Sequence, residues 1–325
     1  MRRVTLVRLG VALALVAFVY VNNTSLLAIA GSGKPVLLAH RGLHQTFSRF
    51  GLKSDTCTAA RIDPPTHPHL ENTLASMAAA FSVGADVVEL DVHPTTDGAF
   101  VVFHDWTVDC RTNGTGVTRS HTLATLKALD IGFGYTADGG KTFPFRGKGV
   151  GLMPTLDEVL SAFPGKRFLI HVKSNEASEG EQLAAKLATL PAPRLADLIV
   201  YGGDAPVASF AASLPAVRSM SRSGLKSCVL GYVAIGWTGY VPSACHRSMV
   251  LLPTNYTAWL WGWPDRLLQR MREVGTDVYV LGPWGGGEEF TRGIDNERQF
   301  RRLPAGYSGG IWTNRIDRIA PLTKR

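Results

Sequence analysis

The sequence lacks the glycine-rich signatures of nucleotide binding. No strand-like run is followed by GxGxxG and there is no GxxxxGK[ST], so neither a dinucleotide site nor a Walker-type phosphate loop has support. Internal repeats, low-complexity tracts and basic-aromatic stripes are also missing. The formal net charge of +8 favours anionic partners such as phosphates, anionic lipid or nucleic acid. Because charge is the only feature that favours nucleic acid, we expect no nucleic-acid partner.

Cysteine is scarce, and its spacing excludes the common zinc motifs. The chain has four cysteines without CxxC spacing, namely Cys57, Cys110, Cys228 and Cys245. In an exported protein such an even set indicates disulfides, whereas in a cytosolic one it would indicate buried free thiols. Of the three possible pairings, we expect Cys57–Cys110 and Cys228–Cys245, because each pair would join loops that lie near one another in the fold proposed below.

One long apolar run lies at the N-terminus, outside the expected fold. Arg2, Arg3 and Arg8 precede the run 9–21, as in a signal sequence, and the sequence Ala-Ile-Ala at 28–30 suits a signal peptidase. At about 13 residues the run is shorter than the ~20 of a usual membrane span. Apolar character resumes at 26–30, so an uncleaved anchor is the alternative. We therefore expect residues 1–30 to be a signal peptide or membrane anchor on an exported protein, periplasmic or extracellular, or held at the membrane.

From residue 34 to 325, short apolar runs alternate with helical patterns. About eight strands over ~290 residues predict a single α/β domain, a (β/α)₈ barrel rather than a doubly wound sheet. Strands are expected at 36–39, 87–92, 100–103, 168–172, 198–201, 217–221, 249–252, 278–281 and 310–312, and helices at 73–83 (capped by Asn72), 155–162, 182–190, 205–214 and 266–274. Two long segments, 43–70 and 107–153, interrupt the alternation after strands, so both should overhang the barrel mouth.

Polar residues gather where the first four expected strands end. In order, these residues are His40 and Arg41, Glu89 and Asp91, His104 and Asp105, and His171 and Lys173. Strand ends of a barrel meet at one mouth. Glu89 and Asp91 are two apart and share a face, and such close carboxylates favour a cation such as Mg²⁺ or Ca²⁺ between them. Together with two histidines, an arginine and a lysine, they indicate phosphoryl-transfer chemistry.

In this order, the motifs resemble those of the glycerophosphodiester phosphodiesterases. The motifs are His40-Arg41-Gly42, Glu71-Asn72-Thr73, Glu89-Leu90-Asp91, Val102-Phe103-His104-Asp105, Met153-Pro154-Thr155-Leu156 and Gly310-Ile311-Trp312. The resemblance implies a TIM barrel with a small subdomain inserted after the third strand, at about 107–151. It also implies a phosphoric diester hydrolase that uses one divalent metal ion, Mg²⁺ or Ca²⁺, and releases an alcohol and glycerol 3-phosphate.

The resemblance assigns roles to the polar residues, with one departure. His40 and His104 would be the acid/base pair, in an order that the sequence leaves open, and Arg41 and Lys173 would hold the phosphate. Glu89 and Asp91 would bind the metal, with Glu71 either a ligand or a carboxylate behind the ligands. Where the family carries glutamate as a third ligand, this chain has His171. His171 either remains a ligand and shifts the preference toward Mn²⁺ or Zn²⁺, or turns aside.

Two other functions stay open at this point. The aromatic stretch 259–264 and an anchored N-terminus would suit a lysophospholipase D-like or sphingomyelinase D-like lipid phosphodiesterase, although barrel packing also explains that stretch. The replacement of glutamate by His171 is the one feature that favours an inactive binding protein. The expected substrate is a glycerophosphodiester or a lysophospholipid, the expected further partner is the membrane, through the N-terminus, and no protein partner is indicated.

Overall fold

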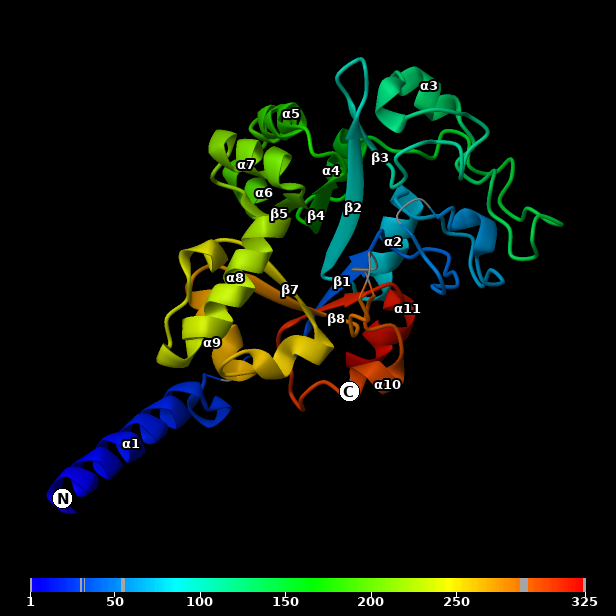
Figure 1. Ribbon diagram of the computed structural model, residues 1–325. Coiled ribbons are helices and arrows are strands. Elements are labelled where there is room, and N and C mark those ends of the chain that lie inside the picture. The colour runs from blue at the N-terminus through cyan, green and yellow to red at the C-terminus, as the bar shows by residue number, and fades with distance from the viewer. Residues whose placement is uncertain (1, 30, 32, 54–55, 287–291, 324–325) are drawn as a thin grey trace.

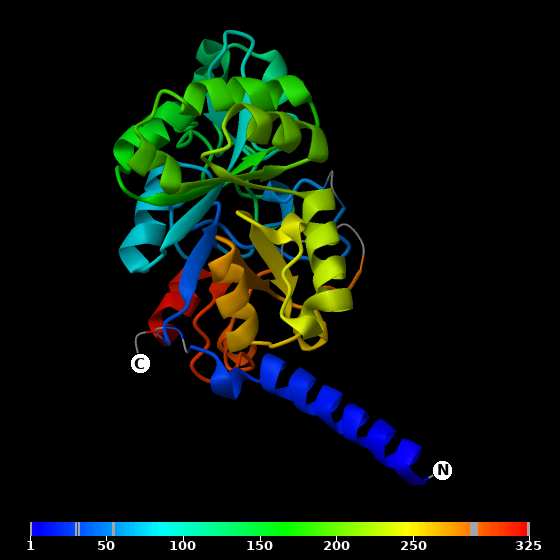
Figure 2. The same ribbon diagram turned by 90° about the vertical axis from the view of Figure 1, so that its left-hand side faces the viewer.

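Eight parallel strands form a nearly closed barrel with helices outside it (Figures 1 and 2). The computed structural model describes every residue except 1, 30, 32, 54–55, 287–291 and 324–325. The barrel strands are β1 (Val36–His40), β2 (Val87–Pro94), β4 (Arg167–Val172), β5 (Leu198–Gly202), β6 (Arg218–Ser221), β7 (Met249–Pro253), β8 (Asp277–Leu281) and β9 (Gly310–Thr313). Their order is β6-β5-β4-β2-β1-β9-β8-β7, with every neighbouring pair parallel. The predicted barrel is confirmed.

Helices follow most strands and cover the outer face of the sheet. They are α2 (Leu74–Val83), α4 (Leu156–Ala162), α5 (Ala177–Leu187), α6 (Ala192–Ala196), α7 (Asp204–Ser213), α8 (Arg222–Ile235), α9 (Asp265–Glu273), α10 (Glu297–Phe300) and α11 (Ile316–Ile319). The sequence analysis missed α8, because Gly224 and Gly231 lower its helix propensity. The helix forms nevertheless, since the Ser221 side chain accepts a hydrogen bond from the Gly224 amide at its start (3.1 Å) and the helix packs on β6 and β7.

The alternation of side chains along the strands separates two layers of core. One set of apolar residues packs between the strands and the helices, among them Val88, Leu90 and Ile170. The other set fills the barrel interior, among them Leu38, Val87, Leu169, Tyr279 and Trp312. Side chains that point inward recur at every second position of a strand. His40, Glu89 and His171 come two residues after the interior residues Leu38, Val87 and Leu169, so they also point inward, nearer the carboxyl ends of the strands. The barrel is therefore apolar below and polar at its mouth.

The expected strand at 100–103 is wrong as a barrel strand. β3 (Phe100–Val102) pairs with one of the named strands, β2, and that pairing is antiparallel, with Val102 opposite Val92. β2 is the longest strand and extends beyond the barrel, and β3 folds back along it. The Phe103 amide then donates to the Asp91 carbonyl (3.0 Å). The hairpin thus returns the chain to the mouth, which is how residues 104 and 105 reach it.

Two long segments cover one side of the mouth and share a small core. They are residues 43–70 and 107–153, which lie side by side in Figure 1; the second contains α3 (Leu123–Ala128). Their apolar residues, among them Ile62, Val108 and Phe145, form a cluster of their own. The Cys57–Cys110 disulfide joins the two segments, and Cys228–Cys245 joins α8 to the turn before β7. Both predicted pairings are confirmed.

A helix of 22 residues, α1 (Arg2–Asn23), projects from the barrel (Figure 2). Its segment Val4–Asn23 spans 20 residues with a mean hydropathy of 2.3 and is long and apolar enough to cross a membrane. The apolar run of about 13 residues expected from the sequence underestimates this helix, because the helix begins before Arg8, at Arg2, and ends at Asn23. The proposed cleavage site at 28–30 lies partly outside the described residues, since residue 30 is among those not described.

Candidate active site

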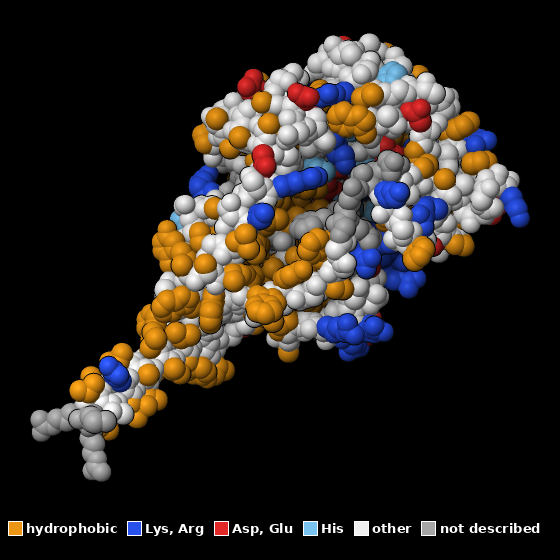
Figure 3. Space-filling view, in the orientation of Figure 1, with side chains coloured by type: hydrophobic (Ala, Val, Ile, Leu, Met, Phe, Trp, Pro, Cys, Tyr) orange, Lys and Arg blue, Asp and Glu red, His pale blue; other side chains and the backbone are white. Residues whose placement is uncertain are grey.

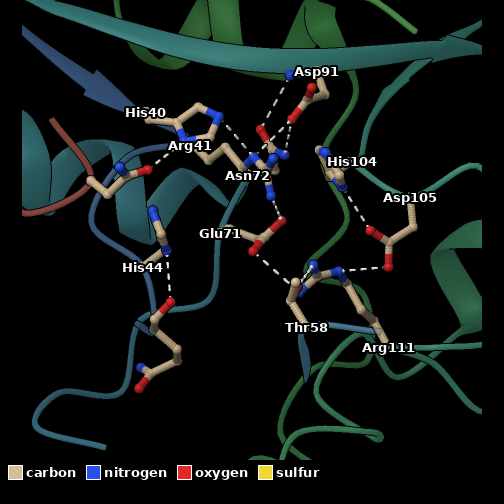
Figure 4. Close-up of polar contacts among 12 residues, drawn as sticks. His40, Arg41, His44, Thr58, Glu71, Asn72, Asp91, His104, Asp105 and Arg111 are labelled. Atoms are coloured by element: carbon tan, nitrogen blue, oxygen red, sulfur yellow. Dashed lines mark hydrogen bonds and ion pairs between the residues drawn. The ribbon is translucent and has the colours of Figure 1, made fainter. Parts of the chain in front are cut away.

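The strand registers bring the predicted polar residues to one level of the mouth. His40 on β1 lies opposite Glu89 on β2, and Asp91 lies opposite His171 on β4. Lys173 follows β4, and its Nζ lies 3.3 Å from Asp91 Oδ1. Figure 4 shows the side chains of His40, Arg41, Asp91 and His104 gathered around this level. The predicted catalytic, phosphate-binding and metal-binding residues, Glu71 aside, therefore meet at one place.

Glu89 and Asp91 form a buried carboxylate pair. Both side chains are almost fully buried. Burial and the neighbouring Asp91 raise the pKa of Glu89 to about 8, whereas Lys173, His104 and Arg41 lower the pKa of Asp91 well below its usual value despite burial. One carboxyl of the pair thus favours a proton at neutral pH unless a further cation lies beside it. A buried carboxylate pair of this kind suits a cation between its members.

His171 completes a group that fits a divalent metal ion. One ligand atom each from Glu89, Asp91 and His171 lies within 4.8 Å of the others. The His171 ring stacks on the Tyr201 ring (centroids 4.3 Å apart), and its Nδ1 donates to Asp91 Oδ1 (2.9 Å). Burial and Lys173 lower the pKa of His171 to about 4, so its imidazole is neutral, as a ligand must be. His171 therefore points into the mouth instead of turning aside.

Glu71 lies apart from this group. Its Oε1 contacts Arg41 Nη1 (3.0 Å), and its Oε2 contacts Arg111 Nη1 (3.1 Å), as Figure 4 shows. The two guanidinium groups lower the pKa of Glu71 despite its burial. Both carboxylate oxygens of Glu71 thus bind arginines. Glu71 therefore lies with Arg41, the expected phosphate-binding residue, and is not one of the three residues that could hold a metal ion.

Arg41 is held in a strained backbone conformation at the end of β1. Its φ is 57°, and that of Asn72 is 58°, a region that side chains other than glycine rarely adopt. The Asn72 amide donates to the Arg41 carbonyl (3.1 Å), and Asn72 Nδ2 donates to Asp91 Oδ2 (3.0 Å). The expected cap at Asn72 is therefore wrong, because the residue that caps α2 is Thr73. Strain of this kind is typical of functional sites.

His40 lies at the bottom of the mouth and is oriented by an amide. Its Nδ1 donates to Asn314 Oδ1 (2.7 Å), and Asn314 in turn donates from Nδ2 to Asp295 (3.0 Å), which fixes the direction of the amide. The Nε2 atom of His40 accepts from Arg41 Nε (3.2 Å). Burial, Arg41 and His44 lower the pKa of His40 well below its usual value. His40 is consequently neutral, with a lone pair on Nε2.

His104 is less buried and is oriented by a carboxylate. Its side chain is 25% exposed, and its Nδ1 donates to Asp105 Oδ1 (2.7 Å). Burial and the cations Arg41 and Lys173 lower the pKa of His104, while Asp91 and the hydrogen bond to Asp105 oppose that shift. A charged acceptor on Nδ1 stabilises the imidazolium, which the neutral amide beside His40 does less well.

Arg111 is a site residue that the sequence reasoning missed. From the inserted segment its guanidinium contacts Asp105 Oδ2 (2.8 Å) and Glu71 Oε2 (3.1 Å), and it donates to Thr58 Oγ1 (2.7 Å). It thus connects the partner of His104 with the partner of Arg41 (Figure 4). Its neighbour Cys110 is disulfide-bonded to Cys57, next to Thr58. No strand-end pattern marks Arg111, because it lies in a loop.

Two more site residues had no role in the expectations from sequence: Tyr201, which was not named, and Asn314, which ends the closing motif Gly310-Ile311-Trp312-Thr313-Asn314. The Tyr201 hydroxyl donates to Glu89 Oε1 (2.7 Å), and Asn314 orients His40. Both lie at or just beyond the carboxyl ends of barrel strands, where the sequence analysis collected only charged residues and histidines. The same positional argument applied to tyrosine and asparagine would have included them.

The fold and the mouth together define a class, the (β/α)₈ barrels with a polar cluster at the strand ends whose carboxylates and histidine could hold a metal ion. Residues 40–192 match the model of the Glycerophosphoryl diester phosphodiesterase family. The family resemblance predicted from the motifs is confirmed for this region.

Named relatives are similar to the chain over parts of its length. A glycerophosphodiester phosphodiesterase of Caldanaerobacter subterraneus subsp. tengcongensis is 43% identical over 103 residues, which cover 32% of this chain and 39% of the relative. That of Bacillus subtilis is 40% identical over 124 residues, covering 36% and 41%. The matched segment therefore spans about two fifths of these relatives' length.

Solved structures support the fold over nearly the whole chain. A glycerophosphodiester phosphodiesterase from Agrobacterium tumefaciens has a TM-score of 0.58 at 21% identity and covers 90% of this chain and all of its own. A phosphodiesterase from Oleispira antarctica, solved with the product sn-glycerol-3-phosphate, has a TM-score of 0.54 at 19% identity, with coverage of 90% and 98%. At these identities the likeness concerns the fold.

Proposed function

We propose that the protein is a metal-dependent phosphodiester hydrolase that cleaves glycerophosphodiesters to an alcohol and glycerol 3-phosphate. The observation that carries this proposal is the meeting of two differently supported histidines with a carboxylate pair, an arginine and a lysine at one barrel mouth. The names of the matching relatives, and the glycerol 3-phosphate bound to one related barrel, support the substrate class.

A bound metal would make the mouth more attractive to an anionic substrate. Among the described residues in direct contact there, four carboxylates (Glu71, Glu89, Asp91 and Asp105) face three permanent cations (Arg41, Arg111 and Lys173), and the proton that Glu89 favours at neutral pH brings the metal-free balance close to zero. With Glu89 ionised, a divalent ion held by Glu89, Asp91 and His171 would make the balance positive, and it would supply Lewis-acid polarisation of the phosphoryl oxygens. Glu71 serves by holding Arg41 toward the phosphate.

His40 is the general base in this mechanism. Its neutral ring carries a lone pair on Nε2, 3.7 Å from Glu89 Oε2 and thus next to the metal-binding group. It accepts a proton from the attacking water as the water oxygen forms a bond to phosphorus. The hydrogen bond from Nδ1 to Asn314 keeps this tautomer in place.

His104 is the general acid. Asp105 stabilises its imidazolium, and its partial exposure places it toward the open side of the mouth, where a leaving alcohol departs. As the bond from phosphorus to the alcohol oxygen breaks, His104 donates its Nε2 proton to that oxygen. Arg41 and Lys173 stabilise the charge on the remaining phosphoryl oxygens.

The test is turnover of glycerophosphocholine by the purified full chain in the presence of Mg²⁺, Ca²⁺, Mn²⁺ or Zn²⁺. We expect glycerol 3-phosphate and choline to be released, activity to disappear with EDTA, and His40→Ala and His104→Ala each to lose about 10²- to 10⁴-fold. Turnover of lysophosphatidylcholine alone would instead support the lysophospholipase D-like alternative, which the exposed aromatic residues near α1 favour. No turnover of either substrate with any of the metals would overturn the proposal.

A further inference from the structure

The last turn of α1 is attached to the barrel by specific hydrogen bonds. The Asn22 and Asn23 side chains both donate to the Trp237 carbonyl (2.9 and 2.8 Å), which lies in the turn η4 (Gly236–Thr238) after α8. Arg270 on α9 donates to the Asn22 carbonyl (2.7 Å) and to Asn23 Oδ1 (3.0 Å). The Phe18 ring meets the Trp237 ring edge-on. The helix is therefore joined to the barrel by a structured contact.

The chain after α1 continues this contact along α9. The Asp265 amide, at the start of α9, donates to the Ser25 hydroxyl (3.2 Å), and the Ile29 amide donates to Gln269 Oε1 (3.2 Å). Arg270 is buried, and two of its partners are supplied by the N-terminal segment. A chain that begins after residue 30 would leave these barrel groups without the partners they have here.

Six exposed apolar residues lie on α8, just after η4, and on or just after the short helix η6 (Thr254–Trp259). They are Leu230, Ile235, Tyr240, Tyr256, Trp259 and Trp261, and we call them the aromatic patch. These are six of the ten large hydrophobic residues that are exposed in the described part of the chain after residue 30. Trp259 is 70% exposed, while Trp261 is tied to α8 by a hydrogen bond from its Nε1 to the Val233 carbonyl (2.8 Å). In Figure 3 hydrophobic side chains run from α1 onto the adjacent barrel surface without a break.

The orientation of α1 agrees with its charges. Arg2, Arg3 and Arg8 are the basic residues near its N-terminal end, and the barrel follows its other end. By the positive-inside rule the barrel would lie on the non-cytoplasmic side, where disulfides such as Cys57–Cys110 persist. Tryptophan and tyrosine on a surface beside a spanning helix are placed where the membrane-water interface lies.

We propose that α1 is retained as a membrane anchor and that the joint holds the aromatic patch against the same bilayer. The barrel is then a membrane-seated domain with a fixed orientation, and not one that swings on a flexible tether. This inference depends on α1, the joint and the patch, and it is independent of the proposed activity.

The first test concerns retention of the anchor. The full chain is expressed in an exporting host, and the mass of the membrane-extracted protein is measured. We expect a species that contains α1 and that resists extraction by alkaline carbonate. A mature protein that begins near residue 31 would overturn the proposal.

The second test locates the patch, using the full chain in phosphatidylcholine vesicles with brominated acyl chains. The chain has 7 tryptophans, and bromine quenches only those near the acyl chains. Trp259→Phe should lower the quenched fraction of the emission, because it removes an emitter at the bilayer. Trp106→Phe, the matched control at an exposed tryptophan on the β3 side, should raise that fraction, because it removes an emitter far from the bilayer. No loss of quenching in Trp259→Phe would overturn the proposal.

The joint is tested by the double variant Asn22→Ala, Asn23→Ala, which removes the two side-chain hydrogen bonds to Trp237 and the one from Arg270 to Asn23 Oδ1 without substituting any barrel residue. The protein should remain in the vesicles, since the apolar span is kept, while the quenched fraction falls as in Trp259→Phe. Unchanged quenching would show that the joint does not set the orientation and would overturn that part of the inference.

Discussion

The two histidines of the mouth have the same side chain and different surroundings. His40 is buried; its Nδ1 partner, Asn314, is an uncharged amide, and its Nε2 accepts from Arg41. His104 is partly exposed and belongs to a chain of ion pairs through Asp105 and Arg111 to Glu71. Burial lowers the pKa of both histidines, and at His104 the hydrogen bond to the Asp105 carboxylate opposes that shift. In the mechanism proposed above, the partner on Nδ1, and not the histidine itself, therefore selects between base and acid.

The largest effect should come from exchanging the charged partner of His104. Asp105→Asn removes the carboxylate that stabilises the imidazolium, so we expect kcat with glycerophosphocholine to fall by about 10³-fold. With a p-nitrophenyl diester, whose leaving group needs no proton, most of the activity should return. Asn314→Ala is the matched variant on the other side; it disturbs the base, and the activated substrate should not rescue it. Rescue of Asn314→Ala in place of Asp105→Asn would reverse the assignment of acid and base.

The burial of His44, which lies beside His40, should limit the stability of the protein in acid. Burial lowers the pKa of His44 to about 4, with Arg41 and Arg49 also lowering it and Glu71 and the Gln45 carbonyl raising it. Between the unfolded pKa of 6.5 and about 4 the unfolded chain binds more protons than the folded one, so stability falls as the pH falls through this window. At 1.36 kcal/mol per pKa unit, His44 accounts for a loss of about 3 kcal/mol.

Urea unfolding between pH 7.5 and 4 measures this effect. His44→Asn keeps a donor toward the Gln45 carbonyl without a group that titrates in this range. Its free energy of unfolding should depend less steeply on pH than that of the parent protein. Equal slopes for the two proteins would contradict the assignment to His44.

The activity of His104 should depend on the guanidinium group of Arg111, which contacts Asp105 and Glu71 at the same time. Arg111→Lys keeps the charge but cannot contact Asp105 and Glu71 together, and losing one charge-assisted hydrogen bond costs about 1.5 kcal/mol. We therefore expect kcat to fall about tenfold with little change in KM, and the p-nitrophenyl substrate to restore it. A rise in KM with unchanged kcat would mean that Arg111 acts through Arg41 and phosphate binding instead.

The smallest effect should follow from a change at His171, one of the three residues that could hold a metal ion. His171→Glu replaces imidazole with the harder ligand that the resemblance leads one to expect, so the preference should move from Mn²⁺ or Zn²⁺ toward Mg²⁺ or Ca²⁺. We expect the ratio of activities with Mn²⁺ and Ca²⁺ to change by about tenfold at most, measured at saturating metal. An unchanged ratio would indicate that His171 does not contact the metal.

Much of the site was predictable because barrel geometry converts sequence position into spatial position. His40, Glu89, Asp91, His171 and Lys173 lie at strand ends, and the barrel brings strand ends together. His104 was placed at the mouth for the wrong reason, since it arrives by the β2–β3 hairpin and not on a barrel strand. Arg111 was missed because its position depends on how a loop of some forty residues folds, which local patterns do not encode.

The sequence by itself determined the barrel and the residue types that meet at the mouth, because alternation and motif order are local properties of the chain. The disulfide pairings followed only once that fold was assumed, because each bond joins separate loops. Only the tertiary structure decided which partner each histidine has, that Glu71 lies between two arginines, and that α1 is joined to α9. These depend on contacts between residues far apart in the chain, whose energies arise from burial and charge that no single segment contains.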